Sequence, residues 1–131
     1  MSEENIEIVR RSFAAFNAGD LETAASEFHP EVEWLPYIGR LGGDVYKGRD
    51  SVVKMWSDIK DHMSGFQIDP VEFIDCGEQV VAVIEVKGIG SLSGATVEQG
   101  WAQLYWMSDG LVRRMEPFPT REAALEAAGG D

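Results

Sequence analysis

The sequence predicts an α+β fold, in which helices are segregated from a mainly antiparallel sheet, and three observations support this prediction. Before Met63, apolar side chains recur three and four positions apart, which is the spacing of amphipathic helices. From Phe66 to Pro119 the chain is rich in valine, isoleucine and aromatic residues, and glycines divide it into short runs typical of strands. At 131 residues without a linker or repeat, the chain fits one domain covering 1–131.

Four segments show helical periodicity. Each follows a residue suited to the N-cap, namely serine, aspartate or threonine, and a proline or glycine lies near the end of each. The second and the last are brief, and the third carries a valine and a tryptophan on its apolar face. The predicted helices cover residues 3–16, 21–28, 51–63 and 121–128.

Five strands are expected. The first lies within "FHPEVEWLPYIG" (28–39), and the others form a meander over 66–77, 78–90, 95–110 and 111–119. The glycine-rich "GRLGGDVYKG" between the first strand and the third helix reads as a loop. The resulting order is α-α-β-α-β-β-β-β-α. A curved sheet wrapped around three N-terminal helices makes a cone, and its open end is a natural pocket for a small molecule.

Composition restricts the partners. The formal charge of −12, from 23 acidic and 11 basic residues, argues against nucleic acid and anionic membranes. No apolar run approaches the roughly 20 residues of a membrane span, and the acidic N-terminus lacks the pattern of a secretory signal, so we expect a cytoplasmic protein. Cys76, the single cysteine, cannot form an internal disulfide. His29 and His62 have no metal-ligand spacing, so neither a metal nor a cofactor is expected.

Several stretches carry a family likeness. They are "VRRSFAAFNAGDLETAASEFHPEVEW", "YKGRDSVVKMW", "DGLVRRMEPF" and "REAALEAAG", which together span essentially the whole chain. In these stretches the chain resembles the SnoaL-like (polyketide cyclase-like) branch of the nuclear transport factor 2-like (NTF2-like) superfamily. The resemblance implies the cone-shaped fold. It does not determine function, because the superfamily includes polyketide cyclases, ketosteroid isomerases and epoxide hydrolases.

The catalytic positions that the resemblance implies hold unsuitable residues. Ketosteroid isomerases use an aspartate base with a tyrosine and a protonated aspartate as oxyanion donors, a case that serves as a standard example of shifted carboxyl pKa values. Here the matched positions hold Pro36 or Leu35, Ser12 and Gln103. The last-strand aspartate of polyketide cyclases and limonene-type epoxide hydrolases falls on Pro117. No known catalytic carboxylate is in place, and Gln103 can donate a hydrogen bond but cannot titrate.

The resemblance and strand alternation together predict which side chains contact a ligand. The family match places Gln103 on the cavity side of its strand, and alternation adds Trp101 and Tyr105, although core packing would also explain these aromatic residues. Trp106 then faces outward, where the superfamily commonly forms a homodimer through the outer sheet face. The predicted ligand-binding residues are Trp34, Tyr37, Tyr46, Trp56, Trp101, Gln103, Tyr105 and Met115.

Three functional hypotheses follow. The first is a small-molecule-binding domain with a hydrophobic, aromatic-lined cavity, and the second is an enzyme acting by general acid–base catalysis on a hydrophobic polycyclic or terpenoid substrate. In the second, Glu85 or a displaced Glu33 or Glu116 is the base and Gln103 positions a carbonyl. An outward-facing Glu85 would instead be a solvated residue paired with Lys87. The third hypothesis is a non-catalytic dimeric scaffold.

Overall fold

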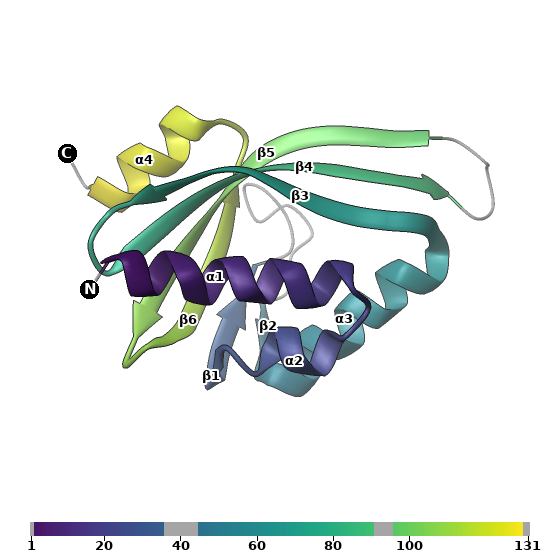
Figure 1. The fold of residues 1–131 in the computed structure, drawn as a ribbon, viewed down its shortest axis with the longest axis horizontal. Helices are drawn as coiled ribbons and strands as arrows, with labels where there is room; N and C mark the ends of the chain where they lie inside the picture. Colours follow the sequence, from purple (N-terminus) through teal and green to yellow (C-terminus); the bar gives the residue numbers. More distant parts are fainter. Residues whose placement is uncertain (1, 36–44, 91–95, 130–131) are drawn as a thin grey trace.

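The computed structural model describes residues 2–35, 45–90 and 96–129, which form a curved, open, six-stranded sheet with helices packed against it (Figure 1). None of the described helices is long and apolar enough to cross a membrane. The helices are α1 (Ser2–Asn17), α2 (Leu21–Ala25), α3 (Arg49–His62) and α4 (Arg121–Gly129). The strands are β1 (Phe28–Trp34), β2 (Tyr46–Lys47), β3 (Met63–Asp75), β4 (Gln79–Gly90), β5 (Thr96–Ser108) and β6 (Leu111–Phe118).

The strand order is β2-β1-β6-β5-β4-β3, and the long strands β3 to β6 form the predicted antiparallel meander. The α+β class and the curved sheet against N-terminal helices are confirmed. The parallel pairing of β1 with β6 is the exception to the antiparallel pattern. The short strand β2 lies in the region predicted as loop. It consists of only two residues, and its order comes from pairing with Glu33 and Trp34 of β1.

The boundary between α2 and β1 differs from the prediction. The helix ends at Ala25 instead of continuing to Phe28, and Ser26 caps it by donating its hydroxyl to the Thr23 carbonyl oxygen at 2.6 Å. Phe28 already belongs to the sheet, opposite Val112 of β6. The β1–β6 register shifts between Phe28 and Glu33, the stretch that contains Pro30. Since proline has no amide hydrogen to donate to a sheet, a break in regular pairing is expected there.

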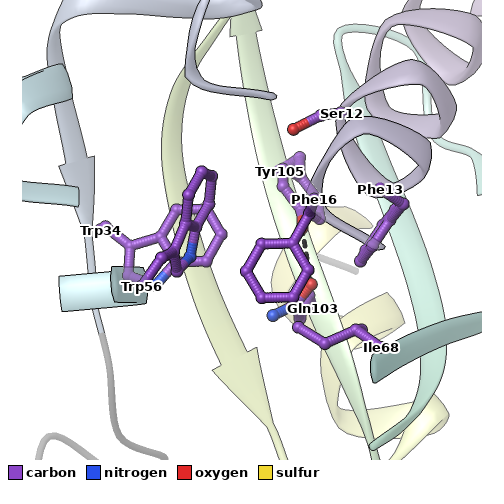
Figure 2. A pocket seen from close by; sticks show the side chains of 8 residues that line it. All are labelled: Ser12, Phe13, Phe16, Trp34, Trp56, Ile68, Gln103 and Tyr105. Carbon is purple, nitrogen blue, oxygen red and sulfur yellow. Dashed lines mark hydrogen bonds between the residues drawn. The ribbon is translucent and has the colours of Figure 1, made fainter. Parts of the chain in front are cut away.

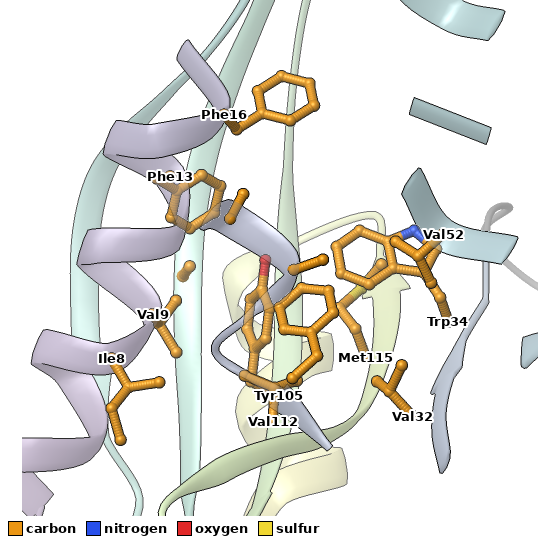
Figure 3. Packing of buried hydrophobic residues seen from close by; sticks show 14 of the residues in the cluster. Ile8, Val9, Phe13, Phe16, Val32, Trp34, Val52, Tyr105, Val112 and Met115 are labelled. Carbon is orange, nitrogen blue, oxygen red and sulfur yellow. The ribbon is translucent and has the colours of Figure 1, made fainter. Parts of the chain in front are cut away.

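The main core fills the concave face of the sheet. Side chains from α1, β1, α3, β5 and β6 converge there, as Figure 3 shows for Val9, Val32 and Met115 among others. Trp34 lies at the centre of an aromatic cluster, with ring centroids 5.5 Å from Phe28, 5.4 Å from Trp56 and 6.2 Å from Tyr105. The predicted inward orientation of Val32 and Trp34 is confirmed by their burial.

A smaller cluster lies on the opposite face of the sheet, under α4. It consists of the buried residues Val81, Ala102, Leu104 and Ala124. On β5, Ala102 and Leu104 of this cluster alternate with Gln103, Tyr105 and Met107, which are buried on the concave side. The alternation predicted for this strand is therefore confirmed over residues 102–107, and it decides which side chains reach the cavity.

The sequence "FNAGD" joins α1 to β3 and to α2. Asn17 at the end of α1 donates from Nδ2 to the Ile68 carbonyl oxygen at 2.8 Å, and its Oδ1 accepts from the Ile68 amide at 3.0 Å. Gly19 adopts a φ of +87°, which glycine tolerates and other residues rarely adopt. Asp20 then caps α2 through hydrogen bonds from the Thr23 amide and hydroxyl. These contacts fix the end of α1 against the sheet.

We expect Asn17→Ala to lower the free energy of unfolding by about 1–3 kcal/mol, because it removes two hydrogen bonds and leaves the part-buried Ile68 backbone groups without partners. Urea denaturation measures the change. Asn5→Ala is the control, since its amide makes one exposed hydrogen bond, to Gly77, and the expected loss is below about 0.5 kcal/mol. Equal losses in the two variants would contradict the role given to Asn17.

Candidate functional site

The concave face of the sheet, together with α1 and α3, encloses a small cavity (Figure 2). Its volume is about 20 Å³. That space is enough for about one water molecule. Between these described side chains there is therefore no room for an organic ligand unless some of them move. The lining residues are Ser12, Phe13, Phe16, Trp34, Trp56, Ile68, Gln103 and Tyr105.

A polar pair lies in this aromatic enclosure. Gln103 and Tyr105 are only 4% and 3% exposed, and the Tyr105 hydroxyl donates to Gln103 Oε1 at 2.5 Å. Figure 2 shows the Gln103 amide nitrogen turned away from Tyr105, on the side facing Trp56. Within the described part of the chain, no group accepts a hydrogen bond from this nitrogen. The cavity thus presents an N–H donor at an otherwise aromatic wall.

The two hydroxyl groups of the described lining, those of Ser12 and Tyr105, already donate within the protein. Ser12, at the position matched to the isomerase tyrosine, donates its hydroxyl to the Ala24 carbonyl oxygen at 3.0 Å. Burial raises the pKa of Tyr105 above its ordinary value, so its phenol stays protonated over the physiological range. Among the amide and hydroxyl groups of the described lining, Gln103 Nε2 is therefore the donor that bonds to none of the described residues.

Several predicted ligand-binding residues meet at this cavity, namely Trp34, Trp56, Gln103 and Tyr105. Met115 is buried in the surrounding core, and Tyr46 and Trp101 pack against that core while partly exposed, without lining the cavity. Tyr37 and Pro36 lie outside the described residues. Phe13 and Phe16 were not among the predicted ligand-binding residues, yet both line the cavity. Their adjacency to Ser12, a matched family position, was the signal that could have identified them as lining residues.

Glu85, the first candidate base, is exposed and does not line the cavity. It lies opposite Gly100 on the outer face of the sheet. The predicted pairing of Glu85 with Lys87 is wrong, because the Lys87 ammonium instead lies 3.9 Å from a carboxylate oxygen of Asp69 on the neighbouring strand. The cross-strand neighbour is the closer partner on a pleated surface.

The displaced candidates, Glu33 and Glu116, also lie away from the cavity. Both interact with Arg114, at 2.7 Å and 3.5 Å respectively. The Arg114 guanidinium lies 5.5 Å from the centre of the Trp106 ring. These residues form a half-buried charged group on the outer face, so the described lining of the cavity contains no carboxylate.

Trp106, the predicted dimer contact, is largely engaged by its own chain. It packs beside the cluster under α4. The side-chain amide of Gln79 bonds to both Trp106 and Ala128. Its oxygen accepts from Trp106 Nε1 at 2.5 Å, and its nitrogen donates to the Ala128 carbonyl oxygen at 2.8 Å. The C-terminal helix therefore covers this part of the outer face, and the homodimer stays a prediction.

Other reactive groups are dispersed. Cys76 is half-buried at the edge of the outer cluster, where burial, followed by the charge of Asp75, raises the pKa of its thiol. A raised thiol pKa reduces the thiolate fraction and hence the nucleophilicity. Over residues 2–35, 45–90 and 96–129, no three histidine, cysteine, aspartate or glutamate side chains gather as a metal site would require.

Comparison with known proteins identifies the family. A model of the SnoaL-like domain matches residues 9–115, the segment that contributes most of the cavity and its walls. The chain belongs to the SnoaL-like family. A relative in Mycobacterium tuberculosis H37Rv, the uncharacterized protein Rv0034, is 31% identical over 128 residues, which cover 95% of each chain. The predicted family is confirmed.

Solved structures confirm the fold of this SnoaL-like chain. TerC, co-crystallized with polyporic acid, is 27% identical with a TM-score of 0.77, and the match covers 98% of this chain and 99% of TerC. An NTF2-like protein of unknown function from Burkholderia pseudomallei K96243 has a TM-score of 0.78 at 21% identity, covering 98% of both chains. A putative SnoaL-like polyketide cyclase from Jannaschia sp. CCS1 has the same TM-score at 17% identity, covering 99% and 94%.

Stability at alkaline pH tests the environment of Tyr105. Because the folded state raises the pKa of its phenol above the ordinary value near 10, the folded state holds the proton more tightly than the unfolded state. The resulting stabilisation is complete below pH 10 and is lost as the pH rises further. We expect the urea midpoint of the wild type to fall more between pH 8.5 and about pH 11 than that of Tyr105→Phe. Parallel pH profiles would contradict the burial of this hydroxyl.

Proposed function

We propose that this SnoaL-like chain binds a small, flat organic molecule whose oxygen accepts a hydrogen bond from Gln103 Nε2. The observation that carries the proposal is the unpartnered amide N–H of Gln103 at the wall of an aromatic cavity. Gln103 is only 4% exposed, so solvent has little access to this N–H, and a ligand oxygen would supply the acceptor that the described residues do not. Among the described lining residues, the remaining surface is dominated by aromatic rings, which favour a flat apolar body.

The acceptor is expected to be a neutral oxygen, such as a ketone carbonyl. No lysine or arginine belongs to the described lining of the cavity. A carboxylate would therefore lose its hydration without gaining an opposite charge, which is unfavourable in a buried site. The neutral amide of Gln103 suits a carbonyl, whose oxygen can accept its N–H groups without a counter-charge.

Binding requires the cavity to widen. At about 20 Å³ it holds roughly one water molecule, so an aromatic ligand must displace some of the rings that line it. Phe16 of α1 and Trp56 of α3 meet edge to face with centroids 5.2 Å apart. Rotation of these two side chains would open the space between the helices. Part of the binding free energy is then spent on this rearrangement, so we expect modest affinity for small probes.

The similarity to TerC supports the proposal, since that relative was co-crystallized with an organic molecule, polyporic acid.

The proposal does not include catalysis by Glu85, Glu33 or Glu116. These carboxylates are exposed or half-buried on the outer face, and none of them lines the cavity. A proton-transfer base must lie within hydrogen-bond reach of the substrate.

Two probes of matched shape test the proposal, namely 4-methylacetophenone, which has a carbonyl, and 4-ethyltoluene, which has none. We expect 4-methylacetophenone to bind the wild type about 5- to 10-fold more tightly, the gain expected from one hydrogen bond of about 1–1.4 kcal/mol. Calorimetric titration, supported by the rise in Tm at saturating ligand, measures both affinities. In Gln103→Met the two probes should bind equally.

The control is Val81→Ala, a core truncation on the opposite face of the sheet that costs about 2 kcal/mol without touching the cavity. It should retain the preference for the carbonyl probe, which separates loss of the donor from general loosening of the core. If neither probe binds the wild type, or if Gln103→Met keeps the preference, the proposed function is wrong.

A further inference from the structure

A buried donor without a partner lies two residues from Gln103 along the same strand. The indole Nε1 of Trp101 is buried and, within the described part of the chain, hydrogen-bonds to nothing. Well over nine-tenths of buried polar groups in folded proteins have a hydrogen-bond partner, so such a group requires an explanation. Trp101 does not line the present cavity, although its side chain packs against the core cluster that encloses it.

The register of the sheet places Trp101 and Gln103 on one face. Across β4, Trp101 lies opposite Ile84 and Gln103 lies opposite Ala82, and both partners are buried in the concave core. Residues two apart on a strand point the same way and are about 7 Å apart along the backbone. The side chains that carry these two N–H groups therefore point to the same, concave face of β5.

Both groups are hydrogen-bond donors. The indole N–H cannot accept, and Gln103 Oε1 is bound by the Tyr105 hydroxyl. A ligand with a single acceptor oxygen would satisfy Gln103 and leave the Trp101 N–H unpaired. A ligand with a second oxygen across a ring would reach the second donor as well.

We infer that the ligand class is a flat ring compound with two neutral acceptor oxygens on opposite sides, as in an aromatic dicarbonyl. One oxygen binds Gln103 Nε2 and the other binds Trp101 Nε1. This inference rests on the proposed function, because it specifies the ligand of the same site. Opening of the cavity has to extend along β5 from Gln103 to Trp101, because Nε1 is buried in the unliganded protein.

The test adds a third probe of the same shape, 1,4-diacetylbenzene, which carries two carbonyl groups. We expect it to bind the wild type at least about fivefold more tightly than 4-methylacetophenone. The variant Trp101→Phe removes the N–H and keeps an aromatic ring. In this variant 1,4-diacetylbenzene should keep only the statistical advantage of carrying two equivalent carbonyl groups, either of which can bind Gln103. The quantity compared is the ratio of the two affinities within each protein, because Trp101→Phe alters the wall of the opened site for both probes and removes a hydrogen bond from 1,4-diacetylbenzene alone.

A direct measurement keeps the inference testable if Trp101→Phe does not fold. In a ¹⁵N-labelled sample the indole N–H resonance of Trp101, one of four tryptophans, should move downfield with 1,4-diacetylbenzene and not with 4-methylacetophenone. Binding of 4-methylacetophenone without any further gain from the second carbonyl would overturn this inference alone. A gain that survives in Trp101→Phe, or an unmoved indole resonance, would do the same. Failure of every carbonyl probe to bind would instead refute the proposed function.

Discussion

The paired hydrogen bonds between the Asn17 side chain and the Ile68 backbone hold the arrangement of this molecule together. They join the end of α1 to β3, which is separated from it in sequence by α2, β1, β2 and α3. An amide side chain that both donates to and accepts from one residue of a strand mimics a neighbouring strand. Because α1 is fixed there, Phe13 and Phe16 are held over the concave face and one wall of the cavity is set (Figure 2).

The aromatic cluster around Trp34 gives the core its stability and limits the space for a ligand. Rings from β1, α3 and β5 meet Trp34 at 5.4–6.2 Å, mostly edge to face, which is the favoured geometry for such contacts. Close packing of this kind leaves few voids. The Gln103–Tyr105 pair interrupts it with one bonded hydroxyl and one free amide N–H group. A polar group within a dense aromatic core is costly as long as its hydrogen bonds are unmet, and a bound acceptor oxygen would meet them, which is the physical basis of the proposed site.

Strand alternation places charged side chains and neutral side chains on opposite faces of the sheet. The acidic surplus of the chain lies largely on exposed positions, and the half-buried carboxylates of β1 and β6 are paired with Arg114 on the outer face. The concave face receives neutral donors and rings. Consequently the high negative charge of the sequence says little about the site, whose recognition depends on hydrogen bonds from uncharged groups.

The sequence by itself determined the class, the family and the faces of the long strands. Helical spacing placed Phe13 and Phe16 on one side of α1, and period-two alternation placed Gln103 and Tyr105 together on β5, because local periodicity alone decides these faces. It did not predict β2, the parallel β1–β6 pairing or the early end of α2, since each depends on partners distant in sequence. Only the tertiary structure decided how little space the described lining residues leave between them, that Lys87 pairs with Asp69 and that the candidate bases lie away from the cavity. Packing density and cross-strand contacts follow from how elements meet in space, and no local pattern encodes that geometry.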